Sequence, residues 1–124
     1  MKTGPILVVE DNPINLKLLR LVLAIDGFDV LVAADAEQAL DILKRVTPSL
    51  IIMDIQLPGM DGLELGRIIK NRDSTRDVKI VAVTAYAMKG DDEKALSVGF
   101  DGYVLKPIDT RSLASEVARH LADD

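Results

Sequence analysis

The 124-residue sequence contains no cysteine and no tryptophan, and it has a single histidine, His120. The absence of cysteine excludes a disulfide scaffold, a thiol nucleophile, an iron–sulfur cluster and a cysteine-ligated zinc site. One histidine cannot build a multi-histidine metal site. A metal site in this protein is therefore expected to rely on oxygen ligands, which favours hard divalent cations over softer transition metals.

Long apolar runs and an excess of positive charge are also missing. No run approaches the roughly 20 apolar residues that a bilayer-spanning helix needs, and the segment after Met1 lacks the apolar core of a signal peptide. We therefore expect a cytoplasmic protein with no membrane partner. The 15 basic residues stand against 20 acidic ones, a formal charge of −5, which disfavours direct binding of nucleic acid through a broad basic face.

Short apolar runs alternate with stretches of helical spacing along the whole chain. The runs are Ile6–Val9, Val30–Val32, Leu50–Met53, Ile80–Val83 and Tyr103–Leu105. Several of them show no polar alternation, which is typical of strands buried on both faces. Five strands alternating with five helices predict an α/β fold, a doubly wound parallel sheet that fills one domain over residues 1–124 with no output domain.

Helix signals separate the predicted strands. Asn12 followed by Pro13 is typical of a helix start, and Gly27 of a helix end. Apolar residues at helical spacing predict the face that each helix buries. For the first helix these are Ile14, Leu18, Leu21 (with Val22) and Ile25; for the second they are Ala36, Ala39, Leu40 and Leu43; for the third they are Leu65, Ile68 and Ile69; and for the last they are Leu113, Val117 and Leu121.

Charged and polar side chains follow the predicted strands at the sheet edge where such folds bind ligands. The first strand is followed by Glu10 and Asp11, the third by Asp54, the fourth by Thr84 and the fifth by Lys106. Two carboxylates about 4 Å apart repel by roughly 4 kcal/mol at an effective dielectric constant near 20. One lysine cannot offset three carboxylates, so the sequence predicts a Mg²⁺ site at this edge, with Mn²⁺ as a substitute.

A carboxylate beside Mg²⁺ and a lysine is suited to attack a phosphoryl group, because the cations neutralise the equatorial oxygens of that group. Asp54 is the candidate nucleophile, since it ends the central buried strand and precedes a turn containing Pro58 and Gly59. Thr84 is placed to donate a hydrogen bond to a phosphoryl oxygen. We interpret Pro58, Gly59 and Gly62 as turn residues.

The sequence resembles the receiver domain of bacterial two-component response regulators over its whole length. Four segments carry the resemblance, and together they form a specific signature in the expected order: Val8–Asn12, Ile52–Gly62, Val83–Ala85 and Lys106–Ile108. It is most similar to stand-alone cell-division and cell-cycle regulators and to hybrid-kinase receivers. The resemblance implies a flavodoxin-like receiver fold with strand order 2-1-3-4-5.

The resemblance also implies roles at the metal site. Asp54 is similar to the phosphoacceptor of the family. Asp11 and Asp54 match direct Mg²⁺ ligands, the backbone carbonyl of Gln56 matches a third ligand, and Glu10 matches a residue that acts through water.

Further positions match the family's switch. Thr84 and Lys106 resemble the pair that senses the phosphoryl group, and Tyr103 resembles the switch aromatic. The side chains of Gln56 and Tyr86 match positions that tune access of water to the site.

These roles imply a signalling switch rather than a conventional enzyme. A histidine kinase or phosphotransfer protein donates a phosphoryl group to Asp54, and the domain catalyses its own phosphorylation and slow dephosphorylation. The output is expected to be binding of a downstream protein by the surface of the fourth helix, the fifth strand and the fifth helix.

Four alternatives remain at this point. The first is that the chain is part of a larger regulator or hybrid kinase, and the second is that it is a receiver that is never phosphorylated. A haloacid-dehalogenase-type phosphatase would need a second aspartate where Gln56 stands. A flavin binder would need a glycine-rich loop in place of Glu10–Asn12, whose charge would repel a phosphate.

Overall fold

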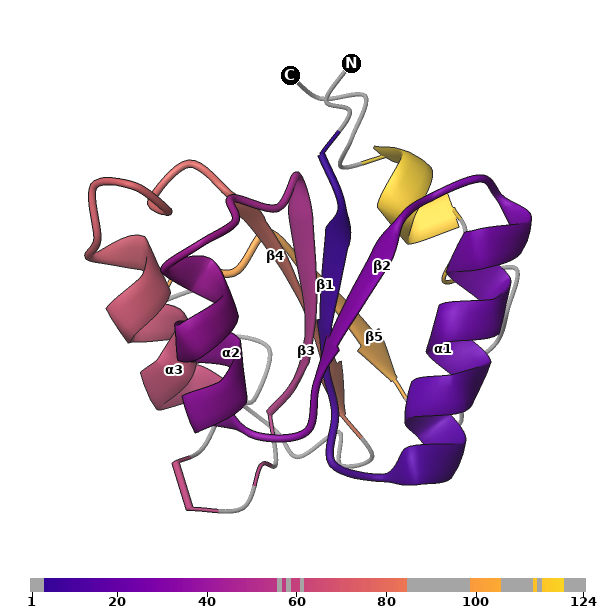
Figure 1. Ribbon diagram of the computed structural model, residues 1–124, viewed down its shortest axis with the longest axis horizontal. Helices are drawn as coiled ribbons and strands as arrows, with labels where there is room; N and C mark the ends of the chain where they lie inside the picture. Colours follow the sequence, from indigo (N-terminus) through magenta and orange to yellow (C-terminus); the bar gives the residue numbers. More distant parts are fainter. Residues whose placement is uncertain are drawn as a thin grey trace.

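The computed structural model describes residues 4–55, 57, 59–60, 62–84, 99–105, 113 and 115–119. Strands and helices alternate along the chain up to the fourth strand (Figure 1). The elements are β1 (Ile6–Val9), α1 (Pro13–Ile25), β2 (Val30–Ala33), α2 (Ala36–Leu43), β3 (Leu50–Asp54), α3 (Gly62–Lys70), β4 (Lys79–Thr84) and β5 (Gly102–Leu105). Residues 115–119 are also helical, whereas the predicted fourth helix lies outside the described residues.

The five strands form one parallel sheet in the order β2-β1-β3-β4-β5. The predicted sheet and its strand order are therefore confirmed. In the central pair, Ile6 lies opposite Leu50 and Val9 lies opposite Met53. Because every strand points the same way, all five carboxyl ends meet at one edge of the sheet.

Alternate residues of each strand face two separate hydrophobic layers. Leu7 and Val9 lie in the layer under α2 and α3, whereas Ile6 and Val8 lie in the layer under α1 and the helical segment near residue 117 (Figure 1). All four of these side chains are fully buried. The absence of polar alternation in the strand sequences follows from this burial on both faces.

The buried face of α1 differs from the prediction. Ile14 is 78% exposed and Ile25 is 83% exposed, whereas Leu19 and Leu23 are buried. Leu21 is also exposed, and of the predicted residues only Leu18 and Val22 are partly buried. The predicted stripe and the true core stripe both follow helical spacing, so periodicity alone could not choose between them. The predicted face of α2 is confirmed, and for α3 the prediction holds for Leu65 and Ile69, whereas Ile68 is half-buried and lies outside the core layer.

The predicted ends of α1 are confirmed. The Asn12 side chain accepts hydrogen bonds from the backbone N–H groups of Ile14 (2.9 Å) and Asn15 (3.2 Å), which is a helix N-cap. At the other end, Gly27 has a φ of +88° and its N–H donates to Ala24. The N–H of Phe28 donates to the carbonyl of Leu23, which completes a Schellman motif. None of the described helices is long and apolar enough to cross a membrane.

Candidate metal and phosphoryl-transfer site

The site is built at the carboxyl edge of the two central strands. Val9 lies opposite Met53 in the parallel ladder, so the next residues along each strand, Glu10 and Asp54, lie level with each other. The backbone N–H of Glu10 donates to the carbonyl of Ala33 (3.0 Å), and this bond extends the pairing of β1 with β2. The sheet therefore fixes the backbone on which both carboxylates are carried.

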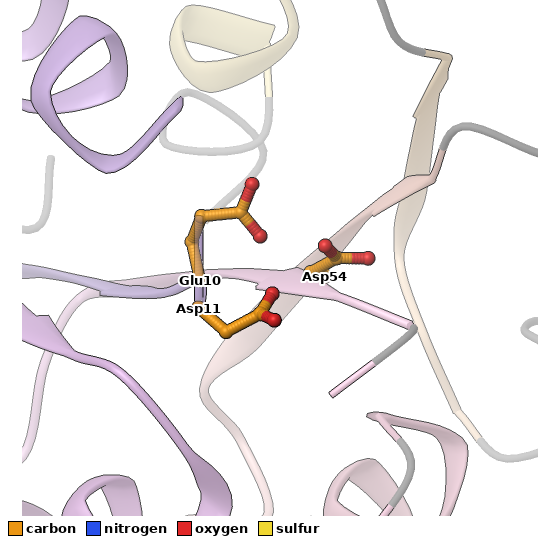
Figure 2. A group of neighbouring side chains, drawn as sticks. All are labelled: Glu10, Asp11 and Asp54. Carbon is orange, nitrogen blue, oxygen red and sulfur yellow. The ribbon is translucent and has the colours of Figure 1, made fainter. Parts of the chain in front are cut away.

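Three carboxyl groups converge at this edge. One oxygen from each of Glu10, Asp11 and Asp54 can be chosen so that all three lie within 4.8 Å of one another. Figure 2 shows the three side chains close together, with Glu10 and Asp11 just beyond the end of β1 and Asp54 at the end of the neighbouring strand β3. Of the sequence-predicted site residues, these are the three that the described part of the structure brings together.

Burial differs between the three side chains. Glu10 is 1% exposed and Asp54 is 5% exposed, whereas Asp11 is exposed. At 4.8 Å and an effective dielectric constant near 20, the repulsion between two carboxylates such as Glu10 and Asp54 is about 3 kcal/mol. A divalent cation among the three groups would replace this repulsion with attraction.

The donor set decides which cation fits. All three groups offer carboxylate oxygens, and the described residues place no histidine beside them. Oxygen-only sites of this kind suit Mg²⁺, which keeps several waters and uses few carboxylates. Asp11 is exposed, so water reaches its side of the cluster.

The structure describes the backbone of two further predicted residues. Thr84 ends β4, one residue beyond Val83, which pairs with Asp54. Tyr103 lies in β5 opposite Ala82. Gln56, Tyr86 and Lys106, which carry the predicted carbonyl ligand, the tuning side chain and the fixed cation, lie outside the described residues.

One residue near the site was missed by the sequence analysis. Gly62 was interpreted as a turn residue, yet it is the first residue of α3 and its N–H donates to the carbonyl of Ile55 (2.6 Å). A Cβ atom on Gly62 would lie 2.4 Å from the carbonyl oxygen of Asp54. The available signal was a glycine at the start of a predicted helix, a position that other residues fill with better helix propensity.

A family model described as "Response regulator receiver domain" matches residues 6–118. The chain belongs to the response regulator receiver family. Receiver domains act in two-component systems as phosphorylation-controlled signalling switches rather than as classical enzymes, and this domain is such a switch. They interact with histidine kinases or phosphotransfer proteins.

Relatives and solved structures agree with this assignment. The domain is 37% identical to the polar-differentiation response regulator DivK of Brucella anthropi. The match extends over 118 residues, which are 95% of this chain and 96% of that protein. It is 36% identical to DivK of Brucella ovis, with 98% of both chains covered.

Among solved structures, a putative response regulator from Chloroflexus aurantiacus superimposes with a TM-score of 0.92 at 30% identity, covering 98% of this chain and 99% of that one. The receiver domain of a sensor histidine kinase from Pseudomonas aeruginosa superimposes with a TM-score of 0.89 at 34% identity, covering 98% of this chain and 100% of that one. That receiver holds a magnesium ion coordinated in its active-site cleft.

Proposed function

We propose that Asp54 is the phosphoacceptor of this receiver domain and that Asp11, Asp54 and the backbone carbonyl of Gln56 bind Mg²⁺, with Glu10 acting through water. The observation that carries the proposal is the convergence of three carboxyl groups within 4.8 Å at the carboxyl edge of the sheet. The magnesium ion in the Pseudomonas aeruginosa receiver supports the choice of metal. Mn²⁺, which accepts the same oxygen ligands, is proposed as a substitute.

In the proposed transfer, a carboxylate oxygen of Asp54 attacks the phosphorus atom of a phosphohistidine on the donor. The new O–P bond forms as the N–P bond breaks, and the electron pair of the broken bond stays on the imidazole nitrogen of the donor. Mg²⁺, when bound, neutralises negative charge on the phosphoryl oxygens. We propose that the domain also takes phosphate from acetyl phosphate by the same step and slowly hydrolyses its own aspartyl phosphate.

Asp54 is held rigidly for this role. Its strand is central in the sheet, and Asp54 pairs with Val83 of β4. The next residue, Ile55, donates its N–H to the carbonyl of Val83 (3.1 Å), so the backbone on both sides of Asp54 is fixed. A nucleophile with little freedom enters the reaction with most of its orientational entropy already lost.

Thr84 and Lys106 are proposed to sense the phosphoryl group through one charge-assisted hydrogen bond each. Such bonds are worth roughly 1.5–3 kcal/mol, so two supply about 3–6 kcal/mol. Moving a two-state equilibrium from 1:99 to 99:1 takes about 5.5 kcal/mol. Two hydrogen bonds at the upper end of this range are therefore enough to operate the switch. Tyr103 is the proposed aromatic that follows Thr84, and Gln56 and Tyr86 are proposed to tune access of water.

A histidine kinase or phosphotransfer protein is the proposed donor, and the exposed face of α1 supports a protein partner. Ile14, Leu21 and Ile25 form an exposed apolar stripe that begins three residues after Asp11. The charged residues of α1 are Lys17 and Arg20, both basic and both exposed, in a protein of net charge −5. This face is suited to an amphipathic helix of a donor that carries acidic residues.

The output surface is proposed to include the fourth helix, β5 and the fifth helix, much of which lies outside the described residues. The output is proposed to be binding of a downstream protein to this surface. The domain is proposed to act as a stand-alone switch in the cytoplasm, without contacting membrane or nucleic acid itself. A receiver within a larger regulator or hybrid kinase is the second candidate, favoured by the likeness to the receiver of a sensor histidine kinase. A pull-down comparing phosphorylated and unphosphorylated protein identifies the output partner.

The test of the proposed site is labelling by radioactive acetyl phosphate in Mg²⁺. Asp54→Asn should abolish labelling while leaving the circular dichroism spectrum unchanged. Asp73→Asn is the matched control, because the Asp73 side chain is 92% exposed and follows the other end of α3. Labelling of Asp54→Asn at the wild-type level would overturn the assignment.

A further inference from the structure

Gly62 lies between helix α3 and the backbone that carries the proposed phosphoacceptor. It is buried, it begins α3, and its N–H donates to the carbonyl of Ile55 at 2.6 Å. The first turn of α3 therefore rests directly on the peptide units of Asp54 and Ile55.

No side chain fits at this position. A Cβ atom on Gly62 would lie 2.4 Å from the carbonyl oxygen of Asp54 and 2.7 Å from the Cα atom of Ile55. Both neighbours are backbone atoms, so neither can rotate away as a side chain would. The φ angle of Gly62 lies outside the left-handed region, so space and not backbone conformation requires the glycine.

Helix α3 cannot retreat from this contact without breaking others. One turn further along, a Cβ atom on Gly66 would lie 1.9 Å from the buried ring of Phe100, so the ring already packs on the helix backbone. At the end of the helix, the Lys70 ammonium group donates to the carbonyl of Val78 (2.7 Å) and to the carboxylate of Asp101 (3.2 Å). The helix is therefore held at its middle and at its end.

We propose that Gly62 is a positioning residue for phosphoryl transfer, because it lets α3 set the place of Asp54 relative to Glu10 and Asp11. The inference rests on the proposed role of Asp54. Because α3 and the backbone of β3 are both held, an added methyl group at Gly62 must displace both, and part of that shift reaches Asp54. A misplacement of about 1 Å at a reacting group costs on the order of 10²-fold in rate.

The experiment compares Gly62→Ala with Gly27→Ala. Gly27 has a φ of +88° and nothing within 4 Å of its would-be Cβ atom, so alanine there strains the backbone without crowding a neighbour. It lies between α1 and β2, at the sheet edge away from Asp54. Both variants should lower the urea midpoint of unfolding, whereas only Gly62→Ala should affect the site.

The readout is the maximal labelling rate at saturating acetyl phosphate and Mg²⁺, expressed per folded molecule. Gly62→Ala should lose roughly 10- to 100-fold and Gly27→Ala should stay within about twofold of the wild type. A wild-type rate in Gly62→Ala would overturn the proposal, as would an equal loss in Gly27→Ala. The role of Asp54 is tested separately, by labelling of the wild type and loss of labelling in Asp54→Asn. The phosphoacceptor proposal for Asp54 and the positioning proposal for Gly62 therefore fail on different results.

If Gly62→Ala does not fold in buffer, all proteins are measured again in trimethylamine N-oxide, which favours the compact state. A refolded variant that labels slowly supports the proposal. A variant that labels at the rate of the refolded controls overturns it. A variant that stays unfolded also overturns it, because Gly62 would then be a requirement of folding and not of positioning.

Discussion

Replacing the Asp54 carboxylate with an amide should change stability in a direction that depends on Mg²⁺. Asp54 and Glu10 are both buried, and their carboxyl groups belong to a cluster within 4.8 Å. The repulsion removed by Asp54→Asn is about 3 kcal/mol at an effective dielectric constant of 20. The amide keeps the volume of the carboxylate, so no cavity offsets this gain. Without metal, the variant should therefore be more stable than the wild type.

The expected gain is roughly 1–3 kcal/mol, since lost hydrogen bonds of the carboxylate reduce the full value. An unfolding entropy of about 2.1 cal/mol/K per residue over 124 residues converts this gain to a rise in Tm of roughly 4–12 °C. Saturating Mg²⁺, at about 100 times its Kd, should stabilise the wild type by about 2.7 kcal/mol. The variant should gain much less, because it has lost a metal ligand.

The assay is thermal and urea unfolding followed by circular dichroism, in EDTA and in Mg²⁺. Asp73→Asn is again the control and should shift neither curve beyond about 0.5 kcal/mol. An Asp54→Asn variant less stable than the wild type in EDTA would refute the electrostatic reasoning. An unchanged gain from Mg²⁺ would show that Asp54 does not bind the metal.

Three further predictions concern the switch, the partner face and the helix cap. Lys106→Ala should still be labelled by acetyl phosphate but should lose phosphorylation-dependent partner binding; partner binding at the wild-type level would contradict the sensing role. Ile14→Asp, at a side chain 78% exposed, should slow transfer from a protein donor at least tenfold without changing acetyl phosphate labelling; equal slowing of both would contradict a docking role. Asn12→Ala should lower the free energy of unfolding by about 1 kcal/mol in urea, because two backbone N–H groups lose their acceptor; no loss would show that water replaces the cap.

Helix α1 shows where sequence reasoning reached its limit. Its sequence carries two apolar series at helical spacing, one through Ile14, Leu21 and Ile25 and one through Leu19 and Leu23. Either series is compatible with an amphipathic helix, so periodicity cannot tell which one faces the sheet. The buried face is set by packing on the sheet, where Leu19 and Leu23 join the layer that contains Ile6 and Val8. Of the predicted residues, the structure leaves Ile14, Leu21 and Ile25 exposed, whereas Leu18 and Val22 are partly buried.

The carboxylate cluster was within reach of the sequence because its geometry follows from topology. Strands that are parallel and adjacent bring their carboxyl ends together, so Glu10, Asp11 and Asp54 could be placed near one another from strand assignment alone. The family signature added the strand order, which periodicity does not determine. A glycine near a helix start marked position 62, but the role of Gly62 could not be predicted, because it depends on a contact between a helix start and a strand end.

The sequence by itself determined the fold class, the positions of the strands and of the described helices, and the grouping of the three carboxylates, because these depend on local pattern and on the direction of the strands. Tertiary structure alone decided which stripe of α1 is buried, how deeply Glu10 and Asp54 are removed from water, and why Gly62 carries no side chain. Those properties depend on the distances between elements, and packing sets them to within fractions of an ångström.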